Sequence, residues 1–439
     1  MNPTHWSLIA TCKMLVVACV ASGCANQVEV SSESSGTGGQ GGRTSSTHIG
    51  SSSTGTPDIG QPSDVYPAPH SAPPTAVNLG GPTVESPSIY PVLFAQDHAN
   101  MKSKIADFMS KVAGSSYWTK TTAEYGIGPA ESNPPIVMNE WVSGTIDDAD
   151  IQSWLTGKLN ANDPKFPVVD DNTVFAVFYP EGVTVSVTEG AKVRLSCADF
   201  GGYHSNVTLD DAHGQLKVPY AIIPRCPTFF KTFTGLDAVT APASHELIEV
   251  ATDPFAKSAP AFEQPDQENM YWAFAVGGGE VGDLCAQNAG VFTKISGLDY
   301  VVQRTWSNES AAAGHDPCVP ALPDKPYFNA APVLPDSITL GGYSVKGVRI
   351  PVGQSSTIDI QLFSDAPMDP WQVKAIDSSE LQGGPKTLSF SFDADTGQNG
   401  QTLHLTMKVL SPTVYNAEVF YLQSSSGDQH NTWIALVGN

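Results

Sequence analysis

Basic residues are scarce in this sequence of 439 residues. Lys and Arg together number 22 against 44 Asp and Glu, which gives a formal net charge of -22 at pH 7. A surface this acidic repels nucleic acid and anionic lipid headgroups, so neither is expected as a ligand. Charged residues nevertheless make up only 15% of the chain and hydrophobic ones 41%, which predicts globular domains and not an acidic disordered protein. The length allows two or three domains.

Several catalytic signatures are absent. The sequence contains no GxSxG nucleophile elbow, no GxxxxGK[S/T] phosphate loop and no CxxC pair. Their absence argues against serine-hydrolase, P-loop and dithiol redox chemistry. Paired acids of the glycoside-hydrolase type stay open, because such acids pair in space and not along the sequence.

The N-terminal hydrophobic run is too short to span a bilayer. It reads MLVVACVASGC after Lys13, and the small residues before Cys24 resemble the lipobox of bacterial lipoproteins. We therefore predict a lipoprotein signal peptide at residues 1–23 and lipidation of Cys24, with an ordinary signal peptide as the alternative. Because Ala25 and not Asp follows, the expected location is the outer membrane or cell surface, or else the periplasm. Residues 24–86, rich in Ser, Gly, Thr and Pro, are predicted to form a disordered tether.

Four cysteines remain outside the leader: Cys197, Cys226, Cys285 and Cys318. An even number in an oxidising compartment predicts disulfides, and pairing of sequence neighbours closes the smallest loops. A cysteine nucleophile is the less favoured alternative.

Residues 87–323 alternate strand and helix patterns and predict an α+β domain. Strands are expected at 88–95, 134–141, 173–180 and 217–224, the last at a sheet edge because of Pro219, and short ones at YWAFA, GVFTKI and LDYVVQRTW. Helices are expected after the first two strands, capped by Asp97 and by Thr145 with Asp148, and again from residue 236. Beyond the Pro-rich segment 320–328, alternating patterns predict an antiparallel, Ig-like β-sandwich at 324–439, an accessory or binding domain.

The segment ASHELIEVATDP, residues 243–254, carries the strongest chemical signal. In a helix, His245 and Glu249 lie on one face a turn apart, the spacing of zinc ligands, and Glu246 takes the place of a general base. A carboxylate instead of the second histidine of HExxH also favours the harder cations Ca²⁺ or Mn²⁺. Glu280 or Asp283 of GGGEVGDLC is the candidate third ligand. The alternatives are an acidic solvated helix and a Gly-rich turn before a disulfide.

For three further residues, a structural role competes with a functional one. Asp253 is predicted as the N-cap of a new helix, with a ligand role as the alternative. His204 is predicted as a loop histidine bonded to backbone, with a ligand or substrate contact as the alternative, and His315 as a surface residue.

Motifs along residues 87–320 resemble a known group. These are SIYPVLFA, SSYW, YGIG, TVFAVFYP, FGGYHS, SHELIEVATDP, GGGEVGDLC and VVQRTWSNES. The pattern is similar to that of bacterial exported proteins distantly related to the plant EXORDIUM or phosphate-induced family, with Val250 and Val281 as mild departures. The resemblance implies a zincin-like domain in which HExxE is the usual form.

These observations predict a lipid-anchored, metal-dependent, peptidase-like hydrolase. His245, Glu249, Glu280 and Asp283 are the candidate ligands of Zn²⁺, and Glu246 is the catalytic base. The alternative is a non-catalytic surface or adhesion lipoprotein, with or without a structural cation. The expected partners are the membrane, through the lipid, and a peptide, protein or cell-wall polysaccharide. We expect a monomer.

Overall fold

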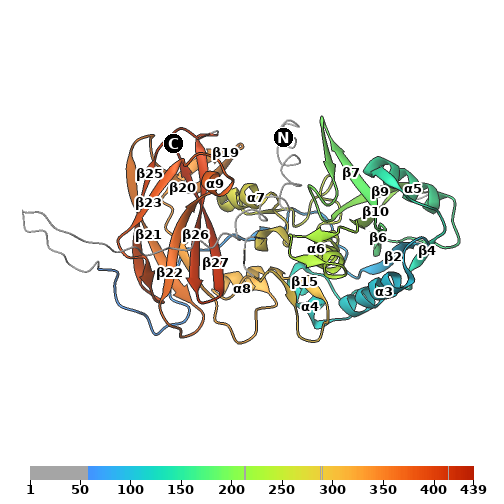
Figure 1. The fold of residues 1–439 in the computed structure, drawn as a ribbon, viewed down its shortest axis with the longest axis horizontal. Coiled ribbons are helices and arrows are strands. Elements are labelled where there is room, and N and C mark those ends of the chain that lie inside the picture. Colours follow the sequence, from blue (N-terminus) through green and yellow to red (C-terminus); the bar gives the residue numbers. More distant parts are fainter. Residues whose placement is uncertain (1–57, 212–213, 287, 289, 414) are drawn as a thin grey trace, which may run out of the picture.

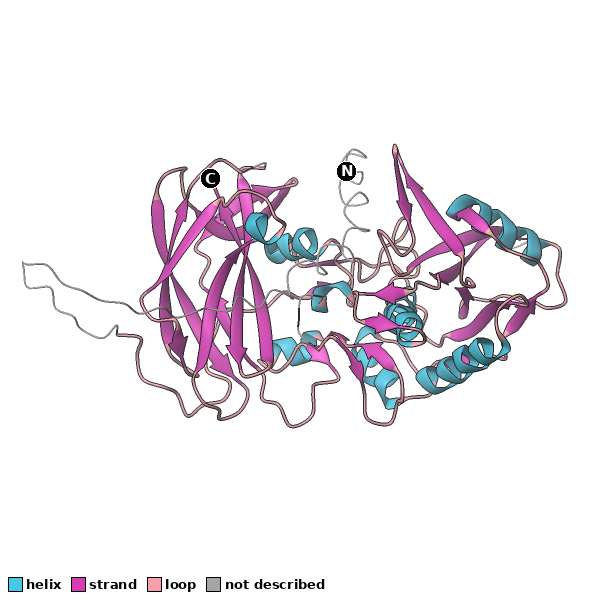
Figure 2. Ribbon diagram, in the orientation of Figure 1, coloured by secondary structure: helices cyan, strands magenta, loops and turns pink. Residues whose placement is uncertain are grey.

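The computed structural model describes residues 58–439 except 212, 213, 287, 289 and 414. The predicted signal peptide, Cys24 and residues 25–57 of the tether lie outside the described residues. A region with helices on a mixed sheet lies beside a second region built almost wholly of strands (Figures 1 and 2). The expected mixture of helix and sheet is confirmed. No helix among the described residues is both long enough and apolar enough to cross a membrane.

A six-stranded sheet forms the centre of the first region. Its order is β3-β2-β6-β10-β9, and β4 also pairs with β2. The neighbours pair in parallel except β9 and β10, which are antiparallel. The prediction of an edge strand at 217–224 is therefore wrong, because β10 lies between two strands; Pro219 is tolerated just before the pairing with β6 begins at Tyr220. The bounds are β2 Ser88–Phe94, β3 Glu131–Ser132, β4 Ile136–Met138, β6 Thr173–Phe178, β9 Tyr203–Asp211 and β10 Gly214–Ile223.

Apolar side chains cover both faces of this sheet. In β6, Val174 and Ala176 pack on one side while Phe175 and Val177 pack on the other, so every residue of the strand is buried. The first face meets α3 (Ala99–Ala113), α4 (Ser116–Thr122) and α6 (Asp237–Thr252), and the second meets α5 (Asp148–Asn160). A small sheet of β5 (Gly144–Asp147), β7 (Val183–Glu189) and β8 (Lys192–Leu195) extends the second side.

Both predicted helix caps are wrong. The N-cap position of α3 is His98, and Asp97 instead forms a two-pronged ion pair with the buried Arg225. The N-cap of α5 is Asp147, whose side chain accepts from the Ala149 N–H. The α3 N-cap makes no side-chain capping hydrogen bond within this described helix, and the α5 N-cap is the residue directly before Asp148.

One short apolar run has the wrong predicted structure. YWAFA is part of a helix, α7 (Tyr271–Val276), and not a strand. It continues a 3₁₀ turn, η3 (Gln267–Asn269), whose N-cap Asp266 accepts from the Asn269 N–H, and it ends at Gly277 with φ 82°. Short apolar runs do not distinguish a strand from a buried helix, and here the flanking cap and the glycine decide. The later runs do form strands: β14 Phe292–Lys294, β15 Val301–Gln303 and β16 Thr305–Trp306.

Two sheets form the C-terminal β-sandwich. The alternation predicted for it is confirmed: Ile358, Ile360 and Leu362 point into the core, as do Leu403 and Leu405 opposite them. The pairing is antiparallel except between β20 and β27, which run in parallel at Val348 and Arg349. One sheet orders β18 (Phe328–Pro332), β21 (Ser355–Ser364), β25 (Thr402–Val409) and β23 (Leu388–Phe392); the other orders β19 (Asp336–Leu340), β20 (Tyr343–Arg349), β27 (Gln429–Gly438), β26 (Ala417–Ser426), β22 (Trp371–Asp377) and β24 (Thr396–Gly397).

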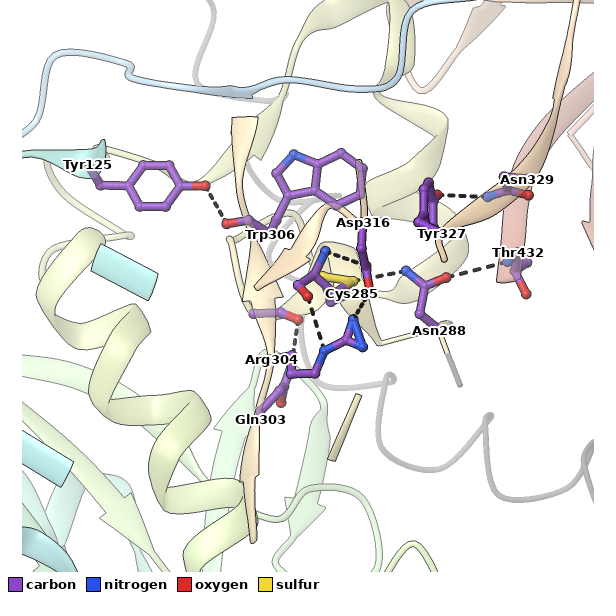
Figure 3. The surroundings of a disulfide bond; sticks show 12 residues. Tyr125, Cys285, Asn288, Gln303, Arg304, Trp306, Asp316, Tyr327, Asn329 and Thr432 are labelled. Carbon is purple, nitrogen blue, oxygen red and sulfur yellow. Dashed lines mark hydrogen bonds and ion pairs between the residues drawn. A yellow bond between two sulfur atoms is a disulfide. The ribbon is translucent and has the colours of Figure 1, made fainter. Parts of the chain in front are cut away.

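Both predicted disulfides are confirmed. Cys197 pairs with Cys226, and Cys285 pairs with Cys318. The second bond lies where the two regions meet (Figure 3): the Asn288 side chain donates to Cys318 Sγ at 3.0 Å and accepts from the Thr432 N–H at 3.4 Å. The indole of Trp272, from α7, packs against Trp433 of β27. The two regions therefore share a buried junction.

Residues 58–86, which we call the N-terminal strap, are not the disordered tether predicted for them. On the sandwich, Ile59 O accepts from the Thr402 N–H, and the Asn399 and Gln361 side chains accept from strap amides. On the first region, β1 (Ala76–Val77) pairs with β13 (Gln264–Pro265). Composition missed these contacts because most of them are backbone hydrogen bonds to residues far away in the sequence.

The buried ion pair between Asp97 and Arg225 leads to a stability prediction. Asp97→Ala leaves a guanidinium only 9% exposed without its carboxylate, which is expected to cost about 3–5 kcal/mol. Urea unfolding measures the loss. The control is Asp299→Ala, whose side chain is 93% exposed and which is expected to change stability by less than about 0.5 kcal/mol. Equal stabilities of the two variants would contradict the prediction.

Candidate metal centre

Helix α6 brings the motif residues to the middle of the first region. Nearly all its side chains are buried, and it packs against the strands β10 and β9 of the central sheet. Glu246 is 5% and Glu249 3% exposed, so neither belongs to an acidic solvated helix face. Buried carboxylates require partners, and the surrounding segments supply them.

His245, Glu249 and Asp283 converge on one point. His245 Nε2 lies 3.0 Å from Glu249 Oε2 and 3.9 Å from Asp283 Oδ1. One ligand atom of each lies within 4.8 Å of the others. Two ligand atoms bound at about 2.1 Å to a tetrahedral ion are about 3.4 Å apart, so these spacings suit a common cation. Of the two candidate third ligands, Asp283 lies beside the pair, while Glu280 is directed elsewhere.

Gln303, from β15, orients the His245 ring. Its Nε2 donates to Gly282 O at 2.6 Å, which turns its Oε1 toward His245 Nδ1 at 2.9 Å. The Nδ1 atom therefore carries a proton, and in the neutral ring Nε2 presents its lone pair to the point shared with Glu249 and Asp283. Sequence reasoning missed Gln303, and no motif marks it.

His204 forms a second contact group with Glu246 and Glu280. His204 Nδ1 lies 3.3 Å from Glu246 Oε2, and its Nε2 lies 3.3 Å from Glu280 Oε1. The favoured prediction of a loop histidine bonded to backbone is therefore wrong: the residue lies in β9, and its ring faces carboxylates. Strand alternation was the available signal, since Tyr203, Val207 and Leu209 are buried in the core on the other face.

Glycines allow the backbone to approach this centre. A Cβ on Gly282 would lie 2.5 Å from His245 Nδ1 and 2.7 Å from Glu249 Oε1. A Cβ on Gly278 would lie 1.8 Å from Asp283 Oδ2. Both positions exclude any side chain, which gives the Gly-rich stretch before Asp283 a physical reason.

Burial and mutual repulsion shift the pKa values of these groups. Burial raises the pKa of Glu249 and of Asp283 above their ordinary values, and the neighbouring carboxylates add to the rise. Burial alone lowers the pKa of His245, but the neighbouring carboxylates Glu249, Glu246 and Asp283 together outweigh it and raise the pKa well above 6.5. The pKa of His204 rises in the same way beside Glu280 and Glu246. Without a cation, protons therefore compensate the charge of the carboxylates.

The residues fit a divalent cation. The side chain of Glu249 is only 3% exposed, and its Oε1 has no hydrogen-bond partner among the described residues. One imidazole nitrogen and two carboxylates form the mixed N and O donor set that Zn²⁺ accepts. An oxygen buried without a donor is costly, and a bound cation removes that cost.

Asp253 and His315 lie outside both contact groups. Asp253 is not the N-cap of a new helix: it is the C-cap of α6, followed by turns, and its carboxylate lies within 4.8 Å of those of Glu263 and Glu280. Burial and Glu280 raise its pKa to about 6. His315 has a side chain that is 55% exposed, as expected of a surface residue.

A cavity of about 130 Å³ opens onto the centre. His204, His245, Glu246 and Asp283 lie in its wall. Aromatic rings cover much of the remainder: Phe200, Phe229, Phe230 and Phe292. The acidic centre therefore borders an apolar pocket, an arrangement suited to a ligand with one polar and one apolar part.

Comparisons with known proteins give no family for this chain. No protein-family model matches it, and no curated protein does. Among solved structures, a chimeric titin Z1Z2 with a decorin peptide is 15% identical and covers 26% of this chain and 95% of its own, with a TM-score of 0.15. The titin M3 domain is 11% identical over 24% of this chain and 94% of its own, also at 0.15. At TM-scores this low, we draw no conclusion about function from these structures.

The raised pKa of Asp253 predicts a pH dependence of the metal-free protein. A carboxyl group whose pKa rises on folding from 3.8 to about 6 binds its proton more tightly when folded. Its contribution to stability is therefore present at low pH and lost as pH rises from about 4 to about 7, a difference of about 3 kcal/mol. We expect urea unfolding in EDTA to show a steeper fall over this range for wild type than for Asp253→Asn. Parallel profiles would exclude the effect.

Proposed function

We propose that this protein is an exported, lipid-anchored, metal-dependent hydrolase that acts on peptides. The convergence of His245, Glu249 and Asp283 carries the proposal, because three ligand atoms, two from α6 and one from the Gly-rich turn, lie within 4.8 Å of one another beside a cavity. A divalent cation held by these residues, Zn²⁺ in first place and Ca²⁺ or Mn²⁺ as alternatives, would act as a Lewis acid on a substrate carbonyl. Glu280 is not among the proposed ligands of this cation.

Glu246 is the proposed general base. It lies in the cavity wall one residue from His245, and its carboxylate can accept a proton from an attacking water. His204 Nδ1 lies 3.3 Å from Glu246 Oε2, so it holds that carboxylate in place and can return a proton to the leaving group. Gln303 has a positioning role, since it fixes the ring of His245.

The proposed substrate is a peptide with a large apolar side chain. The rings of Phe200, Phe229 and Phe292 line the cavity next to the polar centre, so an apolar side chain can enter there while the amide faces Glu246. The proposal also includes three earlier predictions. They are a zincin-like first region, an Ig-like sandwich and a location at the outer membrane.

Glu246→Gln tests the catalytic role. The variant removes the base but keeps the volume, so we expect hydrolysis to fall by roughly 10²–10⁴-fold while zinc stays bound. The measurement is cleavage of a tryptic peptide mixture, followed by mass spectrometry, with zinc content determined on the same samples. Glu181→Gln, an exposed glutamate after β6, is the control and should keep full activity.

His245→Ala tests the metal in the same assay and should abolish both zinc binding and cleavage. If zinc-loaded wild type cleaves no peptide but binds zinc through His245, the protein is a binding lipoprotein with a structural cation. If wild type binds no divalent metal in stoichiometric amount, the proposal of a metal centre fails.

A further inference from the structure

Three carboxylates meet in a second cluster behind the first. Asp253 caps α6, Glu263 precedes β13, and Glu280 lies in the Gly-rich turn; they are 0%, 6% and 5% exposed. One oxygen of each lies within 4.8 Å of the others. Only Glu280 also lines the cavity, so the cluster lies behind the wall formed by this residue.

One oxygen in this cluster points to a ligand. Asp253 Oδ1 accepts from the Ala261 N–H at 2.8 Å, but Asp253 Oδ2 is buried and has no hydrogen-bond partner among the described residues. A carboxylate oxygen cannot be buried cheaply without a donor or a cation. Its neighbours in the cluster are carboxylates, which supply negative charge.

The backbone around the cluster is held in place. A Cβ on Gly279 would lie 2.8 Å from Glu263 O, so only glycine lets these two segments approach. On the outside, the strap binds the loop beside Asp253: the Leu79 N–H donates to Ala261 O at 2.8 Å and the Gly81 N–H to Pro260 O at 2.9 Å. The backbone segments that carry Glu263, Glu280 and Asp253 are thus held together by contacts outside the cluster.

We propose that Asp253, Glu263 and Glu280 bind a second cation, Ca²⁺, at a structural site distinct from the centre formed by His245, Glu249 and Asp283. The ligands are all oxygens, which hard cations prefer, whereas the first centre includes an imidazole. The site shares no ligand with the first centre, and its contact with the proposed catalytic residues is that between Glu280 and His204. Because Ala261 links Asp253 to the strap, calcium also stabilises the docked strap.

The test uses the full-length protein, stripped with EDTA, reloaded with zinc and titrated with calcium. We expect bound calcium at one per chain, a rise in Tm of roughly 5 °C at a hundredfold excess over Kd, and slower proteolysis within residues 58–86. Glu263→Gln should lose all three responses and keep its zinc. His245→Ala should keep the calcium responses and lose zinc.

The matched control is Glu268→Gln, which changes a 63% exposed glutamate five residues farther along and should respond to calcium as wild type does. A calcium response that survives in folded Glu263→Gln, as judged by near-UV circular dichroism, overturns the proposal. If this variant does not fold, the wild-type calcium content decides, and zinc-loaded protein without calcium refutes the site. Loss of calcium binding in His245→Ala alone would assign the ion to the first centre.

Discussion

The structure around α6 depends on how six buried carboxylates are compensated. They are Glu246, Glu249, Asp253, Glu263, Glu280 and Asp283, and each is at most 8% exposed. Two imidazoles, those of His204 and His245, lie among them. Even with both imidazoles protonated, the ionised cluster would carry an excess of negative charge that a protein interior does not tolerate. Cations and protons are the available compensation, and they compete for the same oxygens.

Several segments of the first region converge on this cluster. Helix α6 supplies two of the acids and one histidine, its C-cap supplies Asp253, β9 supplies His204, and β15 supplies Gln303. Glycines at 278, 279 and 282 remove the side chains that would keep these segments apart. The disulfide from Cys285 to Cys318 begins two residues after Asp283 and joins the turn to the junction with the sandwich (Figure 3). The centre is therefore fixed by contacts spread over the whole first region.

Features that depend on residues close together in the sequence could be predicted from it, and features that depend on distant residues could not. The helix at 237–252 and the spacing of His245 and Glu249 are local, and so are the alternating strands of the sandwich. The choice of Asp283 over Glu280 depends on a short 3₁₀ turn, η4 (Asp283–Cys285), which local patterns do not specify. Asp97 finds Arg225 across 128 residues, and no local pattern indicates such a partner. His204 is an intermediate case, because the alternation of Tyr203, Val207 and Leu209 could have indicated its face but not its partners.

The strap shows that composition alone does not decide whether a segment is ordered. A composition rich in Ser, Gly and Pro predicts a chain without structure, yet residues 58–86 bind both the sandwich and the loop at Pro260. Backbone amides make most of these contacts, so they depend little on residue type, apart from Gly81, where a Cβ would lie 2.0 Å from Ala259 O. Because the strap binds Pro260 and Ala261, and the Ala261 N–H donates to Asp253 Oδ1, docking of the strap and the geometry of the acidic cluster are linked through one loop.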